Sequence, residues 1–164
     1  MGLLLAGTNA KAQEEAEGGK EFKNEMTLFT GGTSNLNHHT TSFTIGLEYL
    51  HLFGKSGRLA AGVLGETIFA KHREYLAGAL LYYSPVKREA RSLWFWAGPG
   101  IEFIAEEFIP PDLEETKTIS EFVFRIGGGY FFIVNRFNLG PTIDLDIIRN
   151  NNSIVWGINV GYEF

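Results

Sequence analysis

The sequence predicts an all-β fold: an eight-stranded antiparallel up-and-down transmembrane β-barrel with a polar, side-chain-filled lumen. Three observations predict it. Eight segments alternate between large apolar and small or polar residues, turn-forming residues separate them, and the last segment ends the chain on an aromatic residue. The 20 glycines and 14 phenylalanines favour strands over helices. The sequence has no run of about 18 apolar residues, so no spanning helix is expected.

Composition narrows the class of protein. The chain has 164 residues, which suits one domain. It has 14 basic and 19 acidic residues and no basic cluster, so no nucleic-acid partner is expected. The absence of cysteine excludes disulfides and thiolate metal sites.

The beginning of the chain predicts three parts. Residues 1–12 have the short apolar stretch and the small-x-small pattern Ala10-Lys11-Ala12 of a signal-peptide remnant. Residues 13–24 are rich in Glu and Gly and predict a flexible acidic leader. Residues 25–164 form the barrel.

Turn-forming residues between the alternating segments set the limits of eight predicted strands. Each is long enough for a tilted strand to cross a bilayer, which needs about 9–11 residues, or falls just short of it. An even number allows antiparallel closure with both termini at one end. The predicted strands are 25–32, 41–53, 58–70, 74–84, 92–105, 119–133, 136–148 and 153–164.

The connections predict which end faces which side. Those at 38–39, 71–73, 106–118 and 149–152 fall at the end opposite to the chain's last residue. The segment 106–118, which is acidic and broken by Pro110 and Pro111, is the longest and is predicted to be an external loop.

The last strand shows how the two faces differ. Ile154, Trp156 and Ile158 begin a large apolar face, whereas the alternate residues include Ser153, Asn159 and several glycines. The apolar face is predicted to meet lipid, where a charge would cost about 2–4 kcal/mol at mid-bilayer. The other face is too polar for a soluble core and is predicted to line a closed lumen.

The lumen face of the predicted strands carries several acids and one strand-interior arginine. An unpaired buried ion is costly, so Arg125 is expected to bridge two or more carboxylates. Crowded carboxylates also suit a cation or proton site, but a polar plug that holds a small barrel together is the favoured interpretation. The predicted lumen charge network consists of Glu48, Glu66, Glu102, Arg125, Asp144 and Asp146.

Two tryptophans and two prolines predict how the lumen is filled and where the strand pairing is interrupted. Trp94 and Trp96 are expected to fill much of the lumen, with glycines opposite making room, which argues against an open pore. Pro99 and Pro141 lack the N–H of a ladder hydrogen bond, so a bulge or break is expected at each. They belong to a repeat, because Gly98-Pro99 and Gly140-Pro141 stand at equivalent places in two similar hairpins.

The alternating strands, the signal-like leader and the ending Gly161-Tyr162-Glu163-Phe164 resemble the small eight-stranded outer-membrane barrels of the OmpA/OmpX-like type. The resemblance implies a bacterial outer-membrane location, contact with outer-membrane lipids, and a monomer. It also implies that the barrel-assembly machinery reads the C-terminal strand, with Tyr162 and Phe164 as the assembly signal.

The sequence favours a non-enzymatic barrel with an envelope-structural or surface-interaction role. A lipid A-modifying enzyme and a narrow channel are the alternatives, and a soluble carrier would need the reverse pattern of faces. No catalytic, cofactor or metal site is predicted. His38, His39 and His72 match no metal-site spacing, and the acidic segment at 106–115 is interpreted as solvated rather than cation-binding.

Overall fold

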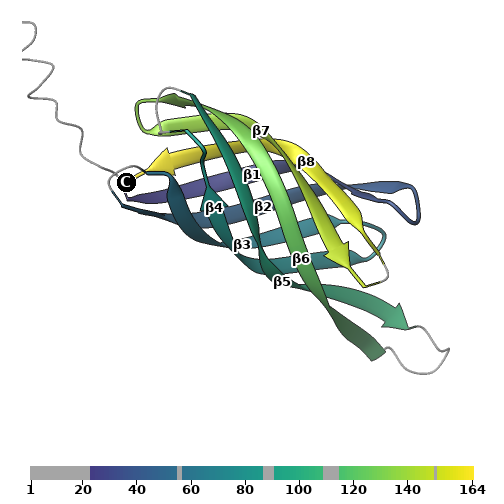
Figure 1. Ribbon diagram of the computed structural model, residues 1–164. Helices are drawn as coiled ribbons and strands as arrows, with labels where there is room; N and C mark the ends of the chain where they lie inside the picture. The colour runs from purple at the N-terminus through teal and green to yellow at the C-terminus, as the bar shows by residue number, and fades with distance from the viewer. Residues whose placement is uncertain (1–22, 55–56, 87–90, 109–114, 150) are drawn as a thin grey trace, which may run out of the picture.

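The computed structural model describes residues 23–54, 57–86, 91–108, 115–149 and 151–164. The predicted signal remnant and nearly all of the leader lie outside the described residues. Those described form eight strands, each paired antiparallel with the next, and β1 pairs with β8 to close a barrel (Figure 1). The strands are β1 Asn24–Asn35, β2 Thr40–Phe53, β3 Leu59–Phe69, β4 Arg73–Tyr83, β5 Arg91–Phe108, β6 Glu115–Val134, β7 Phe137–Ile148 and β8 Ser153–Glu163.

Turn chemistry ends the strands where the sequence predicts. β6 and β7 are joined by two residues, and the first of them, Asn135, has a φ of 58°, a left-handed conformation that asparagine tolerates. Gly54 and Gly57 adopt φ values of 72° and 56° between β2 and β3, where a residue with a Cβ would be strained. Most predicted boundaries therefore agree with the structure within one residue.

The two chain ends meet where the barrel closes. Phe164 donates its N–H to the carbonyl oxygen of Asn24 at 2.9 Å. We call this the terminus end of the barrel and the opposite one the hairpin end. The ends of β2, β4 and β6 and the starts of β3, β5 and β7 lie at the terminus end with the chain ends.

Two boundary predictions are wrong. The first strand, predicted to end at residue 32, continues to Asn35, because Thr33 suits a strand and the residues up to Asn35 still pair with both β2 and β8. The segment 106–118, predicted to be a loop, continues the ladder between β5 and β6 as far as the pair Phe108–Glu115. The physical reason is that Glu115–Ser120 carries β-branched residues at alternate positions, which suit a strand. Figure 1 shows β5 and β6 extending beyond the other strands. The residues 109–114 between them lie outside the described part.

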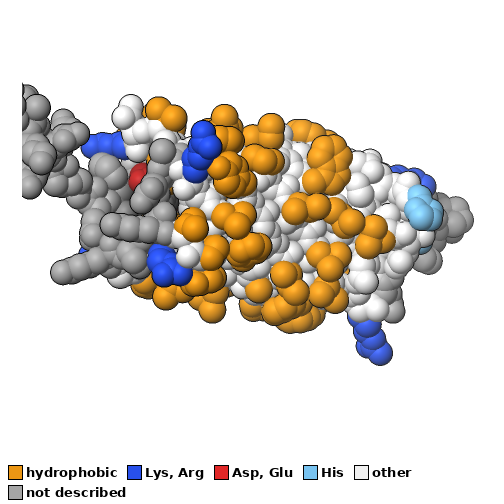
Figure 2. Space-filling view, turned by 45° about the horizontal axis from the view of Figure 1, so that its top comes forward, with side chains coloured by type: hydrophobic (Ala, Val, Ile, Leu, Met, Phe, Trp, Pro, Cys, Tyr) orange, Lys and Arg blue, Asp and Glu red, His pale blue; other side chains and the backbone are white. Residues whose placement is uncertain are grey.

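The outside of the barrel is an apolar belt. In Figure 2, hydrophobic side chains cover the middle of the molecule, while Lys, Arg and His side chains gather toward its ends. The large apolar residues of the predicted outward face are exposed, for example Leu81 at 70 %, Phe122 at 65 % and Ile143 at 59 %. Exposing so many large apolar side chains to water would be unfavourable, so this surface is suited to contact with lipid.

Both prolines interrupt the ladder, as predicted. The β4–β5 pairs stop at Gly78–Gly100 and resume at Leu81–Ala97, so Pro99 falls in the gap. The β6–β7 pairs likewise stop at Gly129–Thr142 and resume at Phe132–Leu139, around Pro141. Each proline still lies in the ladder with the strand on its other side, because only one of its two edges needs the missing N–H.

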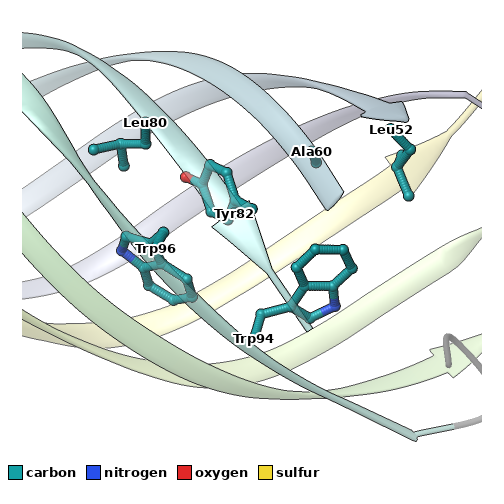
Figure 3. Packing of buried hydrophobic residues seen from close by; sticks show 6 residues of the cluster. All are labelled: Leu52, Ala60, Leu80, Tyr82, Trp94 and Trp96. Carbon is teal, nitrogen blue, oxygen red and sulfur yellow. The ribbon is translucent and has the colours of Figure 1, made fainter. Parts of the chain in front are cut away.

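The lumen is filled, but it is not uniformly polar. A cluster of buried apolar residues occupies the half toward the terminus end, where Tyr82 lies beside Trp94 and Trp96 (Figure 3). A second cluster, of Leu76, Val123 and Ile148, lies in the half toward the hairpin end. The first cluster consists of Leu52, Ala60, Leu80, Tyr82, Trp94 and Trp96. The buried charges lie among these apolar groups.

The described residues contain no helix long and apolar enough to span a membrane.

Candidate functional site: the lumen charge network

Arg125 is the centre of the lumen charge network. Its guanidinium is 4 % exposed and makes four hydrogen bonds to two carboxylates. The Nη1 and Nη2 groups donate to the two oxygens of Glu66 at 2.6 and 2.8 Å, and Nε and Nη2 donate to the two oxygens of Asp146 at 2.6 and 2.8 Å. Two bidentate pairs to one guanidinium fix its orientation and balance one positive charge against two negative charges.

The strands bring these three residues together in two ways. Arg125 and Asp146 are direct ladder partners on β6 and β7. Glu66 comes from β3, on another part of the barrel wall, and its side chain reaches across the lumen. Gly46, its ladder partner on β2, leaves the space for it, because a Cβ at that position would lie 2.7 Å from the Glu66 side chain. The pairing thus joins opposite walls of the barrel.

Asp144 belongs to a second group. Its Oδ1 accepts a hydrogen bond of 2.5 Å from Nε1 of Trp96. Trp96 is the ladder partner of Gly127, and Trp94 is the partner of Gly129, which confirms that glycines face both tryptophans. A Cβ at Gly127 would overlap with Asp144 and with the indole of Trp96. Glycine is therefore required there for the indole to reach the carboxylate.

Glu48 has an aromatic partner that was not identified from the sequence. The hydroxyl of Tyr82 on β4 donates a hydrogen bond to its carboxylate. The signal was present, since the alternation that sends Leu81 and Tyr83 outward sends Tyr82 inward. Tyr82 also packs against Trp96, with ring centroids 5.4 Å apart. The Glu48–Tyr82 pair and the Asp144–Trp96 pair are therefore in contact through their aromatic rings.

Glu102 is buried, apart from these groups. Its ladder partners are Leu76 on β4 and Glu121 on β6, nearer to the hairpin end. The six predicted residues therefore divide into an arginine-centred triad, two carboxylates held by aromatic side chains, and Glu102.

A further buried polar cluster near the terminus end was missed. Glu25 accepts hydrogen bonds from Thr27 at 3.0 Å and from Nδ2 of Asn138 at 2.5 Å. Glu25 is the first residue of the predicted strand 25–32, for which no lumen-facing residues were predicted. Alternation along β1 places Glu25, Thr27 and Phe29 inside.

Two small, separate cavities lie in the lumen. One cavity of about 30 Å³ lies toward the terminus end, and another of about 20 Å³ lies next to Arg125. The wall between them is shared by Glu48, Tyr82, Trp96 and Asn159. Each cavity has the size of about one water molecule. The arrangement is that of a plugged barrel, with charges that tie the walls together.

The described residues offer little for catalysis or metal binding. They contain no group of three His, Cys, Asp or Glu side chains that could hold a metal ion. His51 is bonded to Asn24, at 2.9 Å, near the terminus end. None of the four described histidines is hydrogen-bonded to a serine or a carboxylate, which a nucleophile–base pair would require.

The two residues of the predicted assembly signal lie on the outer surface at the terminus end. Tyr162 packs against Phe137, with ring centroids 5.1 Å apart, and accepts a hydrogen bond from Arg136 at 3.3 Å. The ring of Phe164 lies 6.5 Å from that of Tyr49. These contacts form an aromatic girdle at this end, and recognition of the strand by the assembly machinery stays a prediction.

Comparison with known proteins identifies the architecture. No family model matches the chain, and no curated protein matches its sequence. Among solved structures, the N-terminal β-barrel domain of Pseudomonas aeruginosa OprF is similar, with a TM-score of 0.67 and 13 % identity over 87 % of this chain and 98 % of that one. Ail, the attachment invasion locus protein of Yersinia pestis, has a TM-score of 0.62 and 13 % identity over 88 % and 99 % of the two chains. The outer membrane enzyme PagL has a TM-score of 0.54 and 14 % identity over 85 % and 99 %.

At these identities the likeness shows the fold: the chain is an eight-stranded barrel of the small outer-membrane type, as the resemblance predicted. The apolar belt implies contact with lipid, and the likeness supports the expected location in the bacterial outer membrane. Similar structures include an enzyme and an attachment protein, so the fold alone does not specify the role.

Proposed function

We propose that the chain is a non-enzymatic outer-membrane barrel that serves the envelope by surface interaction, through the hairpin of β5 and β6, and by the stability of its plugged barrel. The observation that carries the proposal is the length of this hairpin. Residues 105–108 of β5 extend beyond the last pair with β4, and residues 115–122 of β6 extend beyond the first pair with β7.

Within the part of the chain that the structure describes, both edges of this extension therefore have no further ladder partner. Eight residues of β6 correspond to about 26 Å of strand at about 3.3 Å per residue. Along this length, among the described residues, β6 pairs only with β5. Unpaired backbone groups on an exposed edge are a template for another strand, so an extended segment of a partner is the kind of ligand that this surface suits.

The enzyme alternative draws on PagL, which shares the fold. A lipid-modifying enzyme needs a base and a nucleophile at the lipid-facing surface near one leaflet. On this chain several outward positions toward the hairpin end are aromatic, including Phe43, Phe69 and Phe122, and the hydroxyls among them, such as that of Ser120, have no histidine hydrogen-bonded to them among the described residues. The absence of a histidine–serine pair among the described residues favours the non-enzymatic role.

The channel alternative requires a continuous lumen. The two cavities are separated by Glu48, Tyr82, Trp96 and Asn159, and Arg125 is held between two carboxylates. Opening a path would break at least one of these groups, so we expect no steady conductance in planar bilayers.

The proposal is tested with a deletion strain that carries either the whole chain or a short-hairpin variant, in which residues 106–117 are replaced by Asn-Gly. The pair Ala105–Thr118 then flanks a two-residue turn, which suits a hairpin. We expect the short-hairpin barrel to fold, with its gel mobility still shifted by boiling, but to lose attachment of the cells to surfaces or to each other. The acyl count of lipid A is expected to be equal in all strains.

A changed lipid A acyl count would favour the enzyme, and step conductance of the purified barrel would favour the channel. Full attachment and normal envelope permeability in the short-hairpin strain would contradict the role given to the hairpin.

A further inference from the structure

The apolar belt contains a groove. It lies on the outer, lipid-facing surface over β3, β4 and β5, and has a volume of about 830 Å³. Its lining is almost wholly apolar. Alanines and a proline form its floor, and an aromatic side chain bounds it on each side. The residues that define it are Tyr49, Ala61, Ala79, Ala97, Pro99 and Phe124.

The strand register explains the hollow. Tyr49 on β2 pairs with Val63 on β3, which pairs with Ala79 on β4, and Pro99 on β5 pairs with Phe124 on β6. Large rings therefore stand at the two sides, and mainly smaller side chains, such as Ala79 and Pro99, lie between them. The walls are four strand spacings apart, about 19 Å along the sheet. The depression is therefore wide enough for two acyl chains lying beside each other.

One large side chain stands inside the groove. Leu81 is 70 % exposed, and its ladder partners on the two sides are Ala61 and Ala97. It divides this part of the groove into two furrows, each floored by an alanine. The division matches a ligand with two chains better than it matches one rounded body such as a helix.

An arginine lies beyond the groove, toward the terminus end of β3 and β4. Tyr83 follows Leu81 on the outward face of β4, and its hydroxyl accepts a hydrogen bond from Nη2 of Arg58 at 2.9 Å. The same guanidinium donates from Nε to the carbonyl of Ser84 at 3.1 Å and from Nη2 to that of Pro85 at 2.9 Å, and it lies 5.5 Å from the Tyr83 ring. These contacts hold the charge in place and use Nε and Nη2.

The Nη1 group of Arg58 has no bond among the described residues, and no described carboxylate forms an ion pair with this arginine. A fixed guanidinium with two donors to spare, beside an interfacial tyrosine, is complementary to a phosphate.

We infer that the groove binds one phospholipid of the leaflet at the terminus end, with its phosphate on Arg58 and its two acyl chains on either side of Leu81. In a bilayer the phosphate of a phospholipid lies at the surface and its two acyl chains lie deeper. Arg58 and the two apolar furrows follow each other in the same order along the barrel wall. A second copy of the barrel fits less well, because its belt offers, among the described residues, no negatively charged group to pair with Arg58 in the way that a phosphate does. The inference rests on the membrane location of the barrel and is independent of the role given to the hairpin.

The test measures binding of two probes to the purified, refolded barrel in detergent by native mass spectrometry. One probe is 1-palmitoyl-2-oleoyl-phosphatidylglycerol, and the other is the diacylglycerol with the same chains but no phosphate. We expect one phosphatidylglycerol to bind each barrel. Arg58→Gln is expected to weaken that binding about fivefold and to leave diacylglycerol binding unchanged. Ala79→Leu fills the groove and is expected to weaken both probes.

Two matched controls change similar groups elsewhere. Arg149→Gln removes an exposed arginine at the hairpin end, and Thr30→Leu adds bulk to an outward position of β1. Both are expected to bind like the wild type. All variants are first shown to be folded by the gel shift between unheated and boiled samples, so that a failed barrel is distinguished from a failed site.

Equal binding of phosphatidylglycerol by the wild type, Arg58→Gln and Ala79→Leu would overturn the inference. So would a lipid-free dimer that Ala79→Leu dissociates, since the groove would then be an interface between copies.

Discussion

Replacing Arg125 by methionine keeps a side chain of similar length and removes the only charge that balances Glu66 and Asp146 in their group. Both carboxylates are buried, 8 % and 1 % exposed, and each would lose two hydrogen bonds of 2.6 or 2.8 Å. Removing one partner of a buried pair commonly destabilises a protein by about 3–5 kcal/mol, because the remaining charge is left uncompensated. We therefore expect Arg125→Met to lower the free energy of unfolding by about 3–5 kcal/mol.

The assay is unfolding by urea in lipid vesicles, with the folded fraction read from gel mobility without boiling. Arg149→Met, an exposed arginine, is the control and is expected to change the free energy of unfolding by less than about 1 kcal/mol. A triple variant that adds Glu66→Gln and Asp146→Asn removes both uncompensated charges, and we expect it to recover most of the lost stability. The reasoning is refuted if Arg125→Met unfolds like the wild type, or if the triple variant is no more stable than Arg125→Met.

Three further predictions concern packing, lipid and assembly. Gly127→Ala places a Cβ against Asp144 and Trp96, and we expect urea unfolding to show a loss of about 1–3 kcal/mol, whereas an unchanged midpoint would contradict the tight fit. Ile143→Arg introduces a charge on the lipid face of β7 and is expected to lower the free energy of unfolding from vesicles by about 2–4 kcal/mol at mid-bilayer; no loss would mean that this face does not meet lipid. Deleting Phe164 is expected to slow insertion in cells, followed by pulse labelling, while the finished barrel melts like the wild type; normal insertion would remove its role as an assembly signal.

The strands were predictable because the lipid and the lumen impose opposite requirements on neighbouring residues. Alternation alone assigned Trp156 outward and Asn159 inward on β8, and both assignments are confirmed by their exposure. The interruptions at Pro99 and Pro141 were predictable for an equally local reason, since each lacks a donor in a ladder that needs one. Features that depend on one residue and its neighbours could be derived from the sequence.

The pairings inside the lumen depend on the geometry of closure. Arg125 was expected to bridge two or more carboxylates, but these were not specified. Asp146 proves to be its ladder partner, whereas Glu66 comes from β3, and which residue from another wall meets Arg125 depends on strand tilt and stagger. The partner of Glu48 was not predicted, because Trp94 and Trp96 were the only aromatic side chains assigned to the lumen and Tyr82 was not among them. The inner face also contains apolar clusters, because a narrow barrel must be filled whatever its polarity.

The extension of β5 and β6 shows that turn-forming residues alone do not locate the ends of a strand. Pro110, Pro111 and the acids around them predicted a loop from 106 onward. Prolines end a strand only where they occur, and the pairs from Ala105–Thr118 to Phe108–Glu115 lie before and after them. The two strands were therefore predicted too short and the loop between them too long, and the extended hairpin that carries the proposed function was not foreseen.

The central claim, that the apolar face meets lipid and the polar face encloses a filled lumen, can be tested with the three tryptophans of the chain. Trp156 is 50 % exposed on the outer face, whereas Trp94 and Trp96 are 7 % and 6 % exposed inside. In vesicles of lipids brominated on the acyl chains, we expect strong quenching of the fluorescence of a variant that keeps only Trp156, and little quenching in Trp156→Phe. Quenching of the two inner tryptophans with an unquenched Trp156 would contradict the account.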